Sequence, residues 1–215
     1  MGIGTKITLV CGGLALLLMA VLALTVQGSY NALVSLDQAV DAQWGQVENV
    51  YQRRSDLVPN LVATVKGAAA FEKDTFTAVA EARARVGQAA AGPRPAGDPA
   101  ALEKFQRAQE GLGAALSRLL VVVERYPDLR ATENFRELQA QLEGTENRIS
   151  VERGRFSEAV QLYNTTIKSF PALLYAGMFG FKDKPYFTAT PGAETPPKVQ
   201  FDFGKPAAAP APAKP

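Results

Sequence analysis

The sequence predicts an all-α protein, with an N-terminal transmembrane helix followed by an antiparallel up-and-down four-helix bundle and an aromatic C-terminal arm. No charged residue lies between Lys6 and Asp37. Beyond this stretch, apolar residues recur at spacings of three and four, which is typical of helices packed on one face. Proline, or proline with glycine, separates most of the periodic segments. The expected boundaries are an N-terminal stub at 1–6, a membrane helix at 7–28, a bundle at 30–170, an arm at 171–190 and a disordered Ala/Pro-rich tail at 191–215.

The membrane helix rests on the stretch ITLVCGGLALLLMAVLALTV, residues 7–26. Twenty apolar residues match about 30 Å of hydrocarbon. A cleaved signal peptide is the alternative, but the sequence before Ser29 is a poor cleavage site. A lipoprotein signal would need a cysteine at the end of the apolar run, whereas Cys11 lies near its start. A buried core helix of a soluble protein is another alternative, but twenty consecutive apolar residues leave no polar face for solvent. Tyr30 is expected at the membrane interface, where a polar-tipped aromatic residue is stable.

Two helices are expected between the anchor and residue 88. The first carries an apolar stripe at Leu33, Leu36, Val40, Val47, Val50 and Leu57, with Trp44 beside it as a core residue. Pro59 interrupts this pattern. We expect a turn there, with a second helix from about Pro59 to Gln88, because 60 straight residues would extend about 90 Å. A kink within one continuous helix is the alternative.

The third and fourth helices have the clearest signals. Asp98-Pro99 supplies an N-cap and a first-turn proline for a helix from Pro99 to about Arg125. The fourth helix starts near Thr132 and keeps a three-four alternation over about five heptads, which predicts a seam against neighbouring helices. Its seam members are Phe135, Leu138, Leu142, Thr145, Ile149, Glu152, Phe156, Ala159, Tyr163, Ile167 and Phe170. The polar members Thr145 and Glu152 are expected to set register or to lie at the seam edge.

The arm begins with PALLYAGMFGFKDKPYF, which is rich in aromatic residues and glycine. We expect it to pack on the bundle as a short turn plus an extended segment. In the alternative arrangement the arm is a flap whose Met178, Phe179 and Phe181 enter the membrane interface. With Tyr30, these three residues are the candidate membrane or partner contacts. The tail lacks the apolar residues needed to offset the entropy of ordering.

Composition argues against catalysis. The chain of 215 residues has 23 basic and 21 acidic residues, a net charge of +2, which provides no field for nucleic acid. It has no histidine, which removes the commonest general base and zinc ligand. Phosphate-loop, dinucleotide and nucleophile-elbow motifs are absent. Glu143, Glu146 and Glu152 share one helix, but this spacing is equally normal on a solvated face. We therefore predict no enzyme, no cofactor, no metal and no small-molecule substrate.

Three blocks together resemble the LemA family of bacterial membrane proteins. They are YNALVSLDQAVDAQWGQVENVYQRRSDLVPNLVATVKG after the anchor, ERYPDLRATENFRELQAQLEGTENRISVERGRF, and YNTTIKSFPALLYAGMFGFKDKPYF. The similarity spans about residues 30–187. It implies an all-helical antiparallel bundle beside one transmembrane helix, a bacterial source and no known enzymatic activity.

The predicted function is a membrane-anchored interaction or scaffold protein of the bacterial envelope, interacting with the lipid bilayer and with itself or other envelope proteins. The alternatives are an accessory or substrate-presenting subunit of a membrane protease or other envelope enzyme, and a lipid-contacting membrane-remodelling protein. The expected location is the inner membrane, with a single pass. Lys6 precedes the apolar stretch and Asp37 follows it, so the positive-inside bias predicts a cytoplasmic N-terminus and an extracytoplasmic bundle.

Overall fold

The computed structural model describes residues 2–68 and 72–188. In these residues it contains helices and no strand. The elements are α1 (Ile3–Ala68), α2 (Lys73–Ala90), η1 (Pro95–Gly97), α3 (Pro99–Val123), α4 (Pro127–Arg130), α5 (Glu133–Lys168) and η2 (Ala172–Leu174). The predicted tail and the last two residues of the predicted arm lie outside the described residues.

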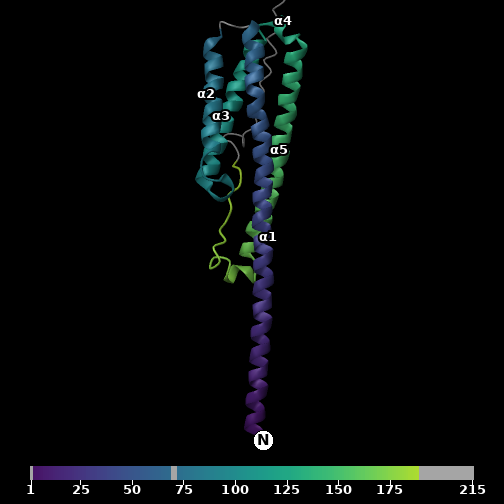
Figure 1. Cartoon of the computed structure of the whole chain (residues 1–215), viewed down its shortest axis with the longest axis vertical. Helices are drawn as coiled ribbons and strands as arrows, with labels where there is room; N and C mark the ends of the chain where they lie inside the picture. Colours follow the sequence, from purple (N-terminus) through teal and green to yellow (C-terminus); the bar gives the residue numbers. More distant parts are fainter. Residues whose placement is uncertain (1, 69–71, 189–215) are drawn as a thin grey trace, which may run out of the picture.

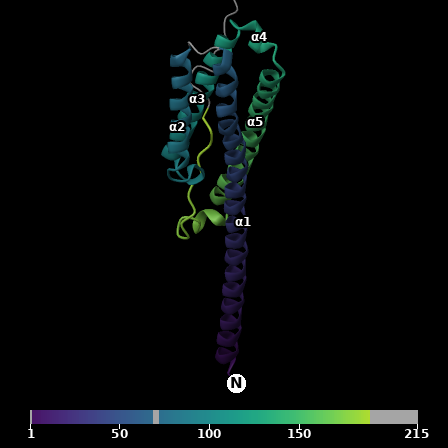
Figure 2. The same ribbon diagram turned by 45° about the horizontal axis from the view of Figure 1, so that its top comes forward.

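Helix α1 is by far the longest element, with 66 residues (Figure 1). At 1.5 Å per residue it extends about 99 Å. The predicted membrane segment and the first predicted bundle helix are therefore parts of one helix. Its first half projects from the rest of the molecule, and its second half runs beside the other helices (Figures 1 and 2).

The predicted turn at Pro59 is wrong, because α1 continues through this residue to Ala68. The chain instead leaves helical structure before α2, so the predicted helix from Pro59 to Gln88 is divided between α1 and α2. Proline has no N–H, and the Ser55 carbonyl four residues earlier therefore lacks its helical donor. Arg83 of α2 supplies a donor instead, because its Nε donates to the Ser55 oxygen at 3.1 Å. A tertiary contact thus compensates for the missing backbone bond.

Among the described residues, the four long helices associate in two pairs. Helix α1 packs along α5, and α2 packs along α3. Successive long helices run in opposite directions (Figures 1 and 2). Asp98 caps α3 by accepting from the Ala100 amide, as predicted. Thr132 caps α5 by accepting from the Phe135 amide.

Two apolar cores lie one above the other along the helices. The core nearer the predicted membrane segment contains Trp44, Phe105 and Phe156, together with residues of the arm. The far side holds residues from the end of α1, from α2, and from the second half of α3 and the first half of α5. Trp44 is fully buried, so its predicted core position is confirmed. Phe170 is the clear exception among the predicted seam residues: α5 ends at Lys168, and Phe170 is 81% exposed.

A layer of buried polar residues separates the two cores. Arg54 is 5% exposed and donates to the Gln109 side-chain oxygen at 2.5 Å, to the Gln109 backbone oxygen at 2.9 Å and to Glu146 at 2.7 Å. Thr145 of α5 is buried at the same level and donates to the Gln141 backbone carbonyl. These contacts join α1, α3 and α5 at a single register, because a shift along any helix would leave a buried charge without its partner.

The Arg83 contact gives a test of how α1 passes Pro59. Arg83→Ala leaves the buried Ser55 carbonyl unpaired and should lower the free energy of unfolding by about 1–3 kcal/mol. In a Pro59→Ala background the new amide supplies the helical bond, so the same substitution should cost clearly less. Chemical denaturation of the four proteins of this double-mutant cycle, each lacking residues 1–28, measures the difference.

The matched control is Arg85→Ala on the same helix. Arg85 is exposed and pairs with Glu81 one turn away, so its loss should cost less than about 0.5 kcal/mol. An equal cost of Arg83→Ala with and without Pro59 would show that the Ser55 contact does not compensate for the proline.

Candidate membrane- and partner-contact site

The structure brings three of the four predicted contact residues together. Tyr30 lies on α1, and its ring meets the Phe179 ring edge-on at a centroid distance of 5.2 Å. It also meets the Phe181 ring at 5.7 Å. Met178 stands apart from this group and is 85% exposed. Phe179 is 50% exposed, whereas Phe181 is partly buried against the core.

The backbone after η2 explains why neighbouring residues differ so much in exposure. Tight turns follow one another here, with Met178 and Phe179 amides both donating to the Tyr175 carbonyl. Gly180 has φ +85°, a left-handed conformation that a side chain disfavours. The Phe181 amide then donates back to the Ala176 carbonyl at 3.0 Å. This reversal directs Phe181 toward α1 and leaves Met178 at the outer edge of the turn.

A shallow apolar groove extends from this group along α1. Tyr30 and Phe179 form one end of it. The other lining residues lie on α1 toward the N-terminus and are Met19, Leu22, Ala23, Val26 and Gln27. The groove therefore connects the aromatic group directly with the end of the apolar stretch.

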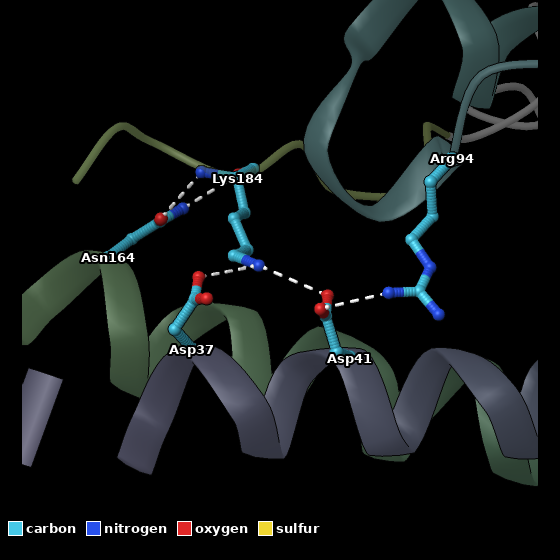
Figure 3. A network of polar contacts seen from close by, with 5 residues as sticks. All are labelled: Asp37, Asp41, Arg94, Asn164 and Lys184. Carbon is cyan, nitrogen blue, oxygen red and sulfur yellow. Dashed lines mark hydrogen bonds and ion pairs between the residues drawn. The ribbon is translucent and has the colours of Figure 1, made fainter. Parts of the chain in front are cut away.

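The arm is fixed to the helices by a polar cluster, which we call the Lys184 clasp and define as Lys184, Asp37, Asp41, Arg94 and Asn164 (Figure 3). The Lys184 ammonium lies 2.8 Å from Asp37 and 3.3 Å from Asp41. Arg94, just before η1, pairs with Asp41 at 3.1 Å. Asn164 of α5 exchanges two hydrogen bonds of 2.9 Å with the Lys184 backbone. The clasp thus joins the arm, α1, α5 and the η1 loop.

The Lys184 side chain is only 10% exposed. Two carboxylates offset the cost of removing its charge from water, and without them this position would be unfavourable for an ammonium group. The ammonium also lies over the Tyr163 ring of α5, with Nζ 5.4 Å from the ring centre. The clasp is therefore a partly buried ion network and not an exposed surface pair.

Tyr163 beside the clasp and Tyr51 beside Arg54 both have a pKa above the ordinary tyrosine value. Burial raises the pKa of Tyr163 to about 12, and the Asp37 carboxylate adds to the rise. Burial also raises the pKa of Tyr51, against the opposing influence of Arg153 and Arg54. Neither hydroxyl is shifted toward the neutral range that general acid–base catalysis requires.

The far end of the arm enters the core. The Phe187 ring stacks on Trp44 at 6.0 Å and meets Phe156 edge-on at 5.5 Å. The Arg153 guanidinium covers the Phe187 ring at 4.4 Å. Thr188 donates its backbone N–H to the Gln106 side chain of α3. The described arm, residues 171–188, is therefore attached to α1, α3 and α5 along its length.

The acidic residues of α5 that were weighed for catalysis make structural contacts. Glu146 pairs with the buried Arg54. Glu152 accepts from Gln43 of α1 at 2.7 Å and pairs with Arg155 at 2.8 Å, and Glu143 accepts from Gln139 one turn away. Within residues 2–68 and 72–188, no group of three or more acidic or cysteine side chains is placed to hold a metal ion.

Sequence reasoning missed the Lys184 clasp and the exposure of Phe170, Leu173 and Leu174. The clasp joins residues as far apart as Asp37 and Lys184, and no local pattern identifies such a pair. The only available signal was a pair of acidic residues, Asp37 and Asp41, one turn apart on the first helix after the anchor.

The sequence model of the LemA family matches residues 43–201. Magnetosome protein MamQ of Magnetospirillum gryphiswaldense is 29% identical over 183 residues, a match that covers 78% of this chain and 67% of the relative. Magnetosome proteins MamQ 1 and MamQ 2 of Paramagnetospirillum magneticum are each 30% identical over 186 residues, with the same two coverages.

The clasp predicts how firmly the arm is held. Lys184→Met removes the ammonium, leaves Asp37 and Asp41 without their shared partner, and should weaken attachment of the arm by about 1–3 kcal/mol. Amide hydrogen exchange in residues 181–188 should then be faster. Lys182→Met is the control, because Lys182 is exposed. Similar exchange rates in the two variants would contradict a role for the clasp in holding the arm.

Proposed function

The chain belongs to the LemA family, and from this premise we propose that it is a membrane-anchored helical-bundle protein that self-assembles or scaffolds other proteins of the bacterial envelope, without catalytic activity of its own. The observation that carries the proposal is the dual role of α1. Its N-terminal part is apolar and unburied, and its C-terminal part contributes Trp44, Val47 and Val58 to the cores.

Anchoring is supported by the composition of α1. It is the one described helix that is long and apolar enough to cross a membrane, with a mean hydropathy of 2.6 in its best 18-residue window and none of that window buried. Leu9, Leu14, Leu18 and Leu22 are each about 60% exposed. A row of exposed leucines is unfavourable in water and favourable in hydrocarbon. Residues 7–28 would lie in the bilayer.

The finer architecture that we infer is a four-helix bundle made by the second half of α1 with α2, α3 and α5. The pairing of α1 with α5 and of α2 with α3 supports it, as do cores that take residues from more than two helices. The arm would close one long side of this bundle through Phe187 and the Lys184 clasp. Such a unit suits a structural role because it holds its surface residues in fixed positions.

Self-assembly is favoured by confinement to a membrane. Anchoring concentrates copies in two dimensions and orients them alike, so weak lateral contacts gain effective concentration. The relatives are named for the magnetosome, and their names describe no reaction. Glu146, one of the acidic residues considered for catalysis, pairs with the buried Arg54.

The proposed orientation places the N-terminus in the cytoplasm and the bundle outside it. Lys6 precedes the apolar stretch, while the first charges after it are Asp37 and Asp41. Positive charges near a membrane segment are retained on the cytoplasmic side. The inner membrane is the site that this arrangement implies.

One experiment tests assembly and orientation together. An amine-reactive cross-linker that cannot cross membranes is added to intact spheroplasts, and to lysed ones in parallel. We expect homo-oligomers or a reproducible partner band in both samples. Cross-links that form only after lysis would overturn the orientation, and monomers alone in both samples would overturn the scaffold proposal.

A further inference from the structure

A cluster of exposed apolar side chains follows the end of α5. It comprises Phe170, Leu173, Leu174, Met178 and Phe179, which are 81%, 60%, 68%, 85% and 50% exposed. Elsewhere on the described helices beyond the anchor, large exposed aliphatic residues such as Val121, Val151 and Leu162 are widely spaced. Isolated exposed apolar residues are normal, whereas a contiguous group marks an interaction surface.

We use the term body for the second half of α1 with the helices and arm packed on it. The cluster lies at the end of the body where the projecting part of α1 begins (Figures 1 and 2). Phe179 touches Tyr30 and lines the groove that continues to Val26 and Met19. The surface is therefore continuous with the apolar stretch that we propose to lie in the bilayer. Whatever covers the last turns of that stretch also meets Phe179.

The cluster is held rigidly to the helices. Ala172, Tyr175 and Ala176 alternate with its exposed members and are buried in the same core as Leu33 and Ile167. The exposed side chains therefore keep a fixed position relative to α1. Their exposure is therefore a feature of the folded structure and does not result from a lack of local structure.

The charges around the cluster suit a membrane surface. No charged residue occurs from Phe170 to Phe181. Lys168, just before this stretch, pairs with Asp183 at 2.8 Å, and Lys182 lies just after it; both lysines are exposed. Lysine side chains extend readily from an apolar surface toward lipid headgroups, and anionic lipids attract them.

We propose that residues 170–179 form an interfacial foot, which inserts Phe170, Leu173, Leu174, Met178 and Phe179 into the boundary between lipid headgroups and acyl chains where α1 leaves the membrane. The occupant is lipid and not a second protein, because the surface joins the membrane segment without a break. Amphipathic segments with large apolar residues and flanking lysines adopt this depth. The foot adds a second membrane contact and would fix the tilt of the body.

This inference rests on the proposed anchoring, so its test includes a separate probe for the anchor. Single cysteines replace Leu17, Met178 or Val121 in a full-length Cys11→Ala background, and each carries an environment-sensitive nitrobenzoxadiazole dye. Leu17 lies mid-anchor, and Val121 is an exposed residue in the last turn of α3. The proteins are reconstituted in phosphatidylcholine–phosphatidylglycerol vesicles with or without lipids that carry a shallow or a deep doxyl quencher.

We expect loss of fluorescence at position 178 with the shallow quencher, at position 17 with the deep quencher, and at position 121 with neither. Quenching at 17 without quenching at 178 would overturn the foot and leave the anchor intact. Protection of the 178 probe from aqueous iodide without lipid quenching would also overturn it and indicate a protein partner. If position 17 is not quenched, the anchor fails, and the foot fails with it.

Discussion

The continuity of the α1 backbone from Ile3 to Ala68 is the constraint on which the other features of this protein depend. Because a single helix supplies both the apolar stretch and one wall of each core, the body has no joint at the point where it meets the membrane. Continuity has a local cost at Pro59, where a backbone bond is missing, and Arg83 of the neighbouring helix offsets it. Contacts with the other helices therefore stabilise α1, and α1 in turn determines the position of those helices relative to the apolar stretch.

Polar contacts determine how the remaining elements align with α1. The Arg54 layer holds α1, α3 and α5 in one register between two apolar cores that alone would tolerate sliding. The Lys184 clasp aligns the arm with the helices, and Phe187 completes the attachment by packing against Trp44 in the core nearer the membrane segment. This fixed geometry places the turn near Met178 beside α1 at the level of Tyr30, just after the apolar stretch. The scaffold role that we propose would require this kind of rigidity.

Much of the fold followed from periodicity, because burial of one helical face is a local property. The seams of α3 and α5 and the burial of Trp44 were predictable on that basis, and the cap at Asp98 was predictable from the Asp-Pro pair at the start of α3. Pro59 was misjudged because its compensation comes from Arg83, 28 residues away from Ser55. Phe170 fits the α5 period but falls beyond the helix end, so its side chain leaves the seam. Three of the candidate contact residues, Tyr30, Phe179 and Phe181, do meet, whereas the clasp that holds the arm depends on distant charge pairs.

The rigid connection between anchor and body is tested most directly by a distance across their boundary. Spin labels at Leu18→Cys and Gln46→Cys, in a full-length Cys11→Ala protein reconstituted in lipid nanodiscs, both occupy exposed positions on α1. A continuous helix separates the two Cα atoms by about 42 Å, from 28 residues at 1.5 Å each. Double electron–electron resonance should give a single narrow distribution consistent with this separation. A broad or clearly shorter distribution would show that α1 bends or breaks where it leaves the membrane, and would contradict the account.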